Sequence, residues 1–197
     1  MPSAIDISSN ALLLVGDNPI NSFSDPGAGA QAAAALYPQV KQRLLAMHPW
    51  SFALKQQRLS LLSAQPDELS RYKYAFQVPT DLIRLWEIAP FQDYTIIGDL
   101  IYANQNTAML ATYIYDVADT AMPAQVVKTL EYMLAAEFAI AITEDENKNA
   151  LYSRKAGEAF AQASTIDSQG RPQVAIKDNP FVDARFSGFT PNGFGSR

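Results

Sequence analysis

The sequence contains no cysteine and a single histidine, and both shortages limit its chemistry. Without cysteine, disulfide bonds, thiolate metal sites and cysteine nucleophiles are excluded. A zinc site takes three or four histidine, cysteine or carboxylate ligands, which one histidine cannot supply. We therefore expect a protein that has no metal ion or other cofactor and is not an enzyme.

Positive charge is also scarce, with 15 basic against 20 acidic residues and a net charge of −5. Proteins that bind nucleic acid through its phosphates usually carry a basic patch. The nearest approaches, Lys41 with Arg43 and Lys55 with Arg58, are interpreted as solvated faces. Tight DNA binding is disfavoured. A role as a channel through which DNA slides is not excluded, because such a channel should hold phosphates weakly.

Long apolar runs are missing as well. No run reaches the roughly 18 residues of a membrane-spanning helix, and the longest candidate is interrupted by Glu137. The N-terminus has neither a basic start nor a long apolar region, so we expect no signal peptide and no membrane partner.

What the chain does have is apolar content, 48% of its 197 residues, which is enough for the core of one domain. Helical patterns cover residues 3–15, with Ile5, Leu12 and Leu13 inward, and residues 30–48. Gly16 and Pro49 are predicted to end these helices. Pro38 lies inside the second pattern and predicts a kink or a restart.

The middle of the chain changes to the two-residue period of strands. Gly98 and Asp99 predict a two-residue hairpin turn. Predicted strands occupy residues 52–62, 72–78, 82–88, 94–97, 100–102 and 109–117, and residues 65–69 form a loop. Aromatic residues are frequent here; most are assigned to the core of a small sheet and some to a subunit interface: Trp50, Tyr72, Tyr74, Phe76, Trp86, Phe91, Tyr94, Tyr102, Tyr113 and Tyr115.

Helical periodicity returns over residues 122–143, with Thr120 as the predicted N-cap. A capping box at 143–146 predicts a second helix to about residue 166, packed antiparallel to the first, with Leu151, Ala159, Phe160 and Ala163 inward. The predicted fold is α+β and mainly α: an antiparallel helical bundle (1–50 and 120–166), an inserted small antiparallel β-sheet region (51–118) and an extended C-terminal arm (167–197).

Candidate catalytic groups are few. A Ser-His-Asp site would need His48 as its base, but Pro49 and Trp50 follow it at a predicted helix end, so we interpret His48 as a packing residue. Gly27 and Gly29 lack the spacing and the lysine of a phosphate-binding loop. The acidic residues at 144–146 suit a helix start better than a cation site. Asp17, Asp116 and Asp119 are interpreted as turn or cap residues.

The aromatic content of the C-terminal arm is not explained by a disordered tail. Disordered segments are normally poor in aromatic residues, yet the last seventeen residues contain Phe181, Phe186, Phe189 and Phe194. Rings at this spacing suit an extended peptide that docks into pockets of a neighbouring subunit or another partner. These four residues are the predicted interaction site.

Four segments, at residues 10–22, 32–53, 74–82 and 130–142, resemble in order and spacing the head-to-tail adaptor (tail tubular protein A) family of short-tailed bacteriophages. The second of them contains the string His-Pro-Trp-Ser-Phe-Ala at 48–53. The resemblance covers residues 3–166 and does not extend with the same clarity into the arm.

This resemblance implies a structural virion protein without catalytic residues, located in the neck of the particle and assembled in the host cytoplasm. It implies a ring of about twelve copies that contacts the portal protein at one end and the tail nozzle at the other, with the tail fibres as a further expected partner. DNA would pass through the lumen without sequence-specific binding.

Three alternatives stay open. One is another neck or tail-completion protein, a stopper or terminator. A second is a small virion-associated hydrolase, which the lone histidine and the lack of a convergent acid pair disfavour. The third is a DNA-packaging binding module, which the missing basic stripe disfavours.

Overall fold

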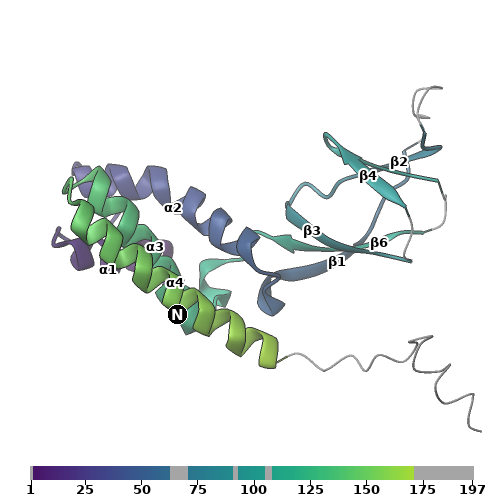
Figure 1. The fold of residues 1–197 in the computed structure, drawn as a ribbon. Coiled ribbons are helices and arrows are strands. Elements are labelled where there is room, and N and C mark those ends of the chain that lie inside the picture. Colours follow the sequence, from purple (N-terminus) through teal and green to yellow (C-terminus); the bar gives the residue numbers. More distant parts are fainter. Residues whose placement is uncertain (1, 63–70, 91–92, 105–107, 171–197) are drawn as a thin grey trace, which may run out of the picture.

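The computed structural model describes residues 2–62, 71–90, 93–104 and 108–170, with helices and strands in separate halves (Figure 1). Within these residues the fold is a mixture of α and β, with four α-helices and two three-stranded antiparallel sheets. All six strands lie between Leu54 and Tyr115, and the α-helices lie before and after them in the chain. The first and last parts of the described chain therefore meet in the helical half.

Helix α1 (Ala4–Val15) begins and ends through local chemistry. Ser3 and Asp6 form a capping box, and Gly16 ends the helix in the left-handed conformation at φ +90°, as predicted. Of the residues predicted to point inward, Leu12 is buried and Ile5 is half-buried. The prediction for Leu13 is wrong, since this side chain is 55% exposed. It lies about 100° around the helix from Leu12 and leaves the buried face.

Helix α2 (Ala28–Met47) runs without interruption through Pro38, so the predicted restart is wrong. Proline removes one helical hydrogen bond. Tyr37 and Val40 are buried on either side of it, and we attribute the continuity of the helix to their packing in the core. The predicted end is confirmed, because His48 is extended at φ −141° before Pro49.

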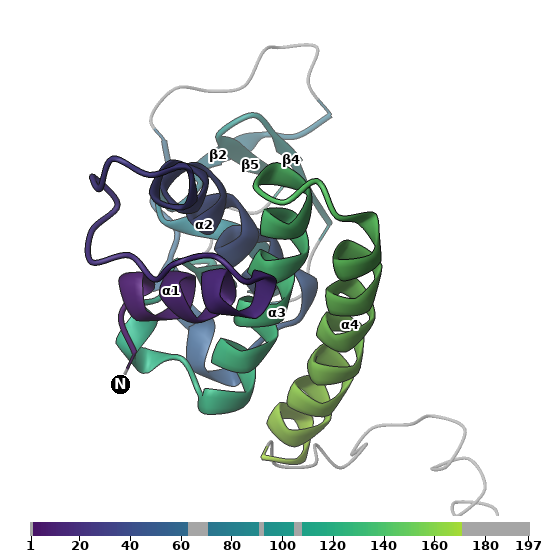
Figure 2. The same ribbon diagram turned by 90° about the vertical axis from the view of Figure 1, so that its left-hand side faces the viewer.

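Helices α3 (Ala124–Ala141) and α4 (Glu146–Gln169) run side by side in opposite directions, joined by a short turn (Figure 2). Two predicted caps are wrong. Pro123, not Thr120, is the N-cap of α3. Asp145, not Thr143, caps α4 by accepting hydrogen bonds from two backbone amides of its first turn, whereas the Thr143 hydroxyl donates back to the Ala139 carbonyl of α3.

The buried face of α4 also differs from the predicted one. Ala163 is buried as expected, but Tyr152 and Ala156 form the rest of this face. Phe160 and Ala159 are half-buried and Leu151 is exposed. The helix continues to Gln169, three residues beyond its predicted end at Ile166, so the proposed arm does not begin at residue 167.

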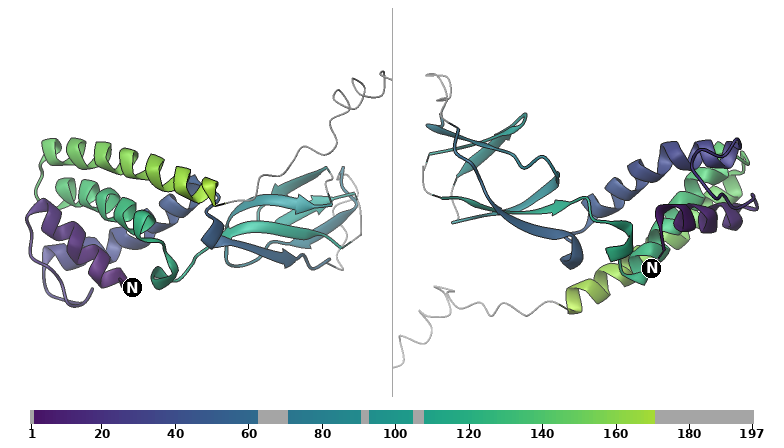
Figure 3. Two further views of the ribbon diagram at one scale, coloured as in Figure 1. Left: turned by 90° about the horizontal axis from the view of Figure 1, so that it is seen from below. Right: turned by 180° about the vertical axis from the view of Figure 1, so that it is seen from behind.

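One sheet has the strand order β1 (Leu54–Arg58), β6 (Leu110–Tyr115), β3 (Leu82–Ala89), and the other has β2 (Tyr74–Gln77), β5 (Leu100–Ala103), β4 (Tyr94–Ile97). The chain enters the strand region through β1 and leaves it through β6, and these two strands pair with each other (Figure 3). The predicted hairpin turn is confirmed: Ile97 pairs with Leu100, and Gly98 has φ +58°.

Each half has its own core. Trp50, Leu44, Leu130 and Phe138 are fully buried among the helices, and Phe76, Ile101, Met109 and Tyr113 among the strands. Phe76 and Tyr113 thus confirm the assignment of aromatic residues to the core of the sheets. The assignment is wrong for Trp50, which belongs to the helical core, and for Trp86, which is 46% exposed. The predicted loop at 65–69 and the aromatic Phe91 lie outside the described residues.

Candidate functional site

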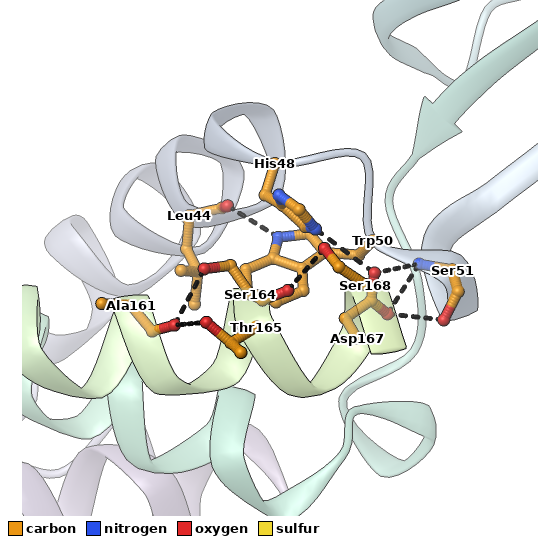
Figure 4. A network of polar contacts seen from close by, with 9 residues as sticks. All are labelled: Leu44, His48, Trp50, Ser51, Ala161, Ser164, Thr165, Asp167 and Ser168. Carbon is orange, nitrogen blue, oxygen red and sulfur yellow. Dashed lines mark hydrogen bonds and ion pairs between the residues drawn. The ribbon is translucent and has the colours of Figure 1, made fainter. Parts of the chain in front are cut away.

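The corner where α2 leads into β1 contains the only histidine of the sequence (Figure 4). Trp50 is fully buried, and its indole N–H donates to the Leu44 carbonyl at 3.0 Å. The His48 ring contacts Trp50 edge to face, with 4.7 Å between ring centroids, and Phe160 of α4 meets Trp50 from another side at 5.8 Å. These contacts confirm that His48 is a packing residue.

Asp167, near the end of α4, connects this corner to the last helix. Its carboxylate accepts hydrogen bonds from the Ser51 backbone amide at 3.0 and 3.2 Å and from the Ser51 hydroxyl. It also lies 3.3 Å from Nε2 of His48. Ser51 begins the short 3₁₀ helix η1 (Ser51–Ala53), so one carboxylate joins α4 to the connection between helices and sheet.

The corner therefore brings together a serine, a histidine and an aspartate, but in an order different from that of a catalytic triad. In a triad the histidine lies between the other two and accepts the serine proton. Here Asp167 lies between Ser51 and His48, and the Ser51 hydroxyl donates to the carboxylate. The arrangement can fix the chain direction, but it does not activate Ser51 as a nucleophile.

Lys41 does not lie on a solvated face, so the interpretation of this residue from the sequence is wrong. Its side chain is 11% exposed, and its ammonium lies 2.8 Å from both Asp116 and Asp119. Burial lowers the pKa of Lys41, but hydrogen bonds to the two carboxylates outweigh this effect and raise the pKa overall. Lys41 therefore stays charged and ties α2 to the segment that leads from β6 to α3.

A buried carboxylate links α1 to α3. Glu131 is 5% exposed, and it accepts hydrogen bonds from Asn10 of α1 and from Lys128, both at 2.8 Å. The hydrogen bond to Glu131 raises the pKa of Lys128. Sequence reasoning missed this contact because Asn10 and Glu131 are 121 positions apart.

In the strand half, polar side chains cluster around Asp81, in the turn before β3. Lys55 of β1 lies 2.7 Å from one carboxylate oxygen, and the Tyr113 hydroxyl of β6 lies 2.8 Å from the other. The hydrogen bonds from Lys55 and, second, from Tyr113 hold the pKa of Asp81 below its ordinary value. Lys55 is 44% exposed, in keeping with the predicted solvated face, and its charge is paired.

Apolar side chains are exposed on the strands as well as on the helices. Trp86 on β3 and Ile96 on β4 are each 46% exposed, and Ile97 beside it is 62% exposed. Such side chains on strands are available for contacts with another molecule. The four predicted interaction residues, Phe181, Phe186, Phe189 and Phe194, lie outside the described residues.

The described residues offer neither a metal site nor a membrane span. They contain no group of three or more histidine, cysteine or carboxylate side chains that could hold a metal ion. No helix among them combines the length and the apolar character needed to cross a membrane.

Compared with models of protein families the chain matches none, and it has no match among curated proteins.

Proposed function

We propose that this chain is a structural protein of a bacteriophage virion, a head-to-tail adaptor that forms a ring of about twelve copies between the portal and the tail nozzle. The observation that carries the proposal is the arrangement of the halves. Helices from both ends of the described chain pack together, and the strand region is inserted between α2 and α3 (Figures 1 and 3). The four resembling segments cover the end of α1 with the loop after it, α2 with the corner after it, β2 with the turn to β3, and most of α3.

The proposal also assigns a role to the helices and to the residues after α4. The helices act as an antiparallel bundle, and the residues after α4 act as an extended arm that contacts the portal or a neighbouring copy. A connector of this kind must withstand pressurised DNA, so large subunit interfaces should supply much of its stability.

The exposed side chains on the strands support ring formation. A cyclic ring uses heterologous contacts, in which one patch meets a different patch on the next copy. Trp86 on β3, and Ile96 and Ile97 on β4, are exposed apolar side chains of the strand half that are available for such contacts.

The net charge of the chain supports a role as a DNA conduit. The net charge of −5 favours a lumen that holds DNA phosphates weakly during genome ejection. The portal binds one end of the ring, and the tail nozzle, with the tail fibres, binds the other.

Native mass measurement with negative-stain imaging tests the proposal, using the purified protein alone and mixed with portal. Rings of about twelve copies on the portal are expected. An inert monomer in the presence of portal would contradict it, and binding to a completed tail end instead would favour a stopper or terminator.

A matched pair of variants tests the exposed apolar side chains of the strands in the same assay of ring formation. Ile97→Asp places a charge on β4 where the side chain is 62% exposed, so the monomer should fold while ring formation is lost. Leu151→Asp makes the same kind of change on α4, at a side chain 38% exposed, and serves as the control.

A further inference from the structure

A groove runs along one side of α4 and is formed by two adjoining hollows, of which the first is mainly apolar and the second is partly polar. The first, about 340 Å³, is lined mainly by Met47, Met133, Ala136, Gly157 and Phe160. The second, about 540 Å³, is lined by Met47, His48 and Phe160 with residues of the last turns of α4. Met47 and Phe160 border both hollows. The two hollows therefore form one continuous surface, called here the α4 groove.

The chemistry of the α4 groove suits an aromatic ring. Methionine side chains are flexible and polarisable, and they make favourable contacts with aromatic rings. Met47 is 50% exposed although its neighbours in α2, Leu44 and Leu45, are fully buried. On one side of the groove Arg43 and Glu137 form an ion pair at 2.7 Å, so their charges neutralise each other.

The groove ends where the remaining chain begins. Ser164, Thr165, Ser168 and Gln169 line its second hollow, and Ser164, Thr165 and Ser168 lie beside His48 at the end of α4 (Figure 4). Residues 171–197 follow, with Phe181 as their first aromatic residue. Gln169 and Phe160 are separated by nine helical residues, about 14 Å. The eleven residue-to-residue steps from Gly170 to Phe181 can span up to about 36 Å, which is enough to turn back into the groove.

We propose that the α4 groove binds the phenylalanine-bearing segment 173–197 of the same chain. A tether of this length gives an effective concentration in the millimolar range, so the chain's own rings outcompete those of a second copy at micromolar protein concentration. This inference does not depend on the proposed ring. A segment held in this way keeps its rings covered until a stronger partner displaces it.

The absence of cysteine allows a clean cross-linking test in the full chain. Ser153→Cys places a thiol in the groove at an exposed position, and Ser187→Cys places one between Phe186 and Phe189. The control pair combines Ser187→Cys with Gln162→Cys, which is exposed on the opposite side of α4. Mild oxidation should close the groove pair about ten times faster than the control pair, within one chain and at a rate independent of protein concentration.

Replacing the four phenylalanines of the segment by serine in the groove pair should reduce the rate to that of the control. Methyl NMR of methionine gives a second measurement, because aromatic rings in the groove shift the Met47 and Met133 methyl signals and the serine variant removes that shift. Equal rates for the two pairs, or insensitivity to the phenylalanines, would overturn the proposal. So would disulfides that form mainly between chains at a rate that rises with concentration, since these indicate a second copy as the source.

Discussion

Lys41 in α2 and Asp119, at the start of the short 3₁₀ helix η2 (Asp119–Ala121), form a 2.8 Å ion pair across the junction of helices and strands. Asp116 completes the site from the other side of the ammonium. The lysine is almost fully buried and Asp119 is 22% exposed, so little water screens the pair. This ion pair fixes the path of the chain as it returns from β6 to α3.

Replacing Lys41 by Met should destabilise the protein by about 3 kcal/mol, the low end for a broken buried pair, because Asp116 is 55% exposed and can regain water. Urea unfolding measures this loss. Arg43→Met on the same helix is the control. Its pair with Glu137 is 53% and 38% exposed, and its loss should cost less than about 1 kcal/mol. Equal effects of the two variants would contradict a special role for Lys41.

The acid sensitivity of the strand half should depend on Asp81. Its folded pKa lies below the ordinary 3.8, so the unfolded chain takes up the proton first as the pH falls. The stabilisation is present above about pH 4 and is lost as the pH falls through the folded pKa. Asp81→Asn should therefore flatten the acid side of a plot of unfolding free energy against pH.

Lys55→Met tests the cause of this slope, since Lys55 is the first contributor to the lowered pKa of Asp81. It should reduce the same slope, and the double variant should differ little from Asp81→Asn alone. Additive effects of the two substitutions would show that the residues act independently.

Asp167→Ala should loosen the end of α4. The Ser51 amide and hydroxyl lose their acceptor, at a cost of about 1–3 kcal/mol for hydrogen bonds to a charged group. Hydrogen exchange should become faster over residues 160–170 and stay unchanged in β5. Ser164→Ala, which removes only an exposed hydroxyl bond to Ala161, is the control and should leave exchange as it was.

Two glycines should respond to alanine in opposite directions. Gly16 has φ +90°, where a Cβ atom is strained, so Gly16→Ala should cost about 1–2 kcal/mol. Gly157 lies inside α4 with no atom within 4 Å of the position that a Cβ would take, so Gly157→Ala should gain about 0.5–1 kcal/mol. Thermal unfolding midpoints separate the two, and stabilisation by Gly16→Ala would contradict the assigned helix cap.

Features set by neighbouring residues could be predicted from the sequence. Gly16, Pro49 and the Gly98-Asp99 turn act through their own backbone preferences, and all three occur as expected. Local reasoning failed where several residues could serve the same role, as when Asp145 rather than Thr143 capped α4.

Contacts between distant parts of the chain could not be predicted. Lys41 meets Asp116 and Asp119, and Asp167 meets Ser51 across 116 positions, only because the strand region returns the chain to the helices beside its point of departure. Hydrophobic period indicated the buried side of α1 only in part and that of α4 incorrectly, and it does not show which polar residue will be opposite. The predicted aromatic site at 181–194 lies in a part of the chain that the structure does not describe.

The pairing of β1 with β6 has a mechanical consequence. Both strands lead to the helices at the same end through short connections, and they pair antiparallel from Leu54 with Ile114 to Arg58 with Leu110. When a tensile load acts on the far end of this sheet, the two strands carry it in parallel. The hydrogen bonds between them are then not sheared. The load then reaches the helices at two anchor points, the Trp50 corner and the Lys41 ion pair.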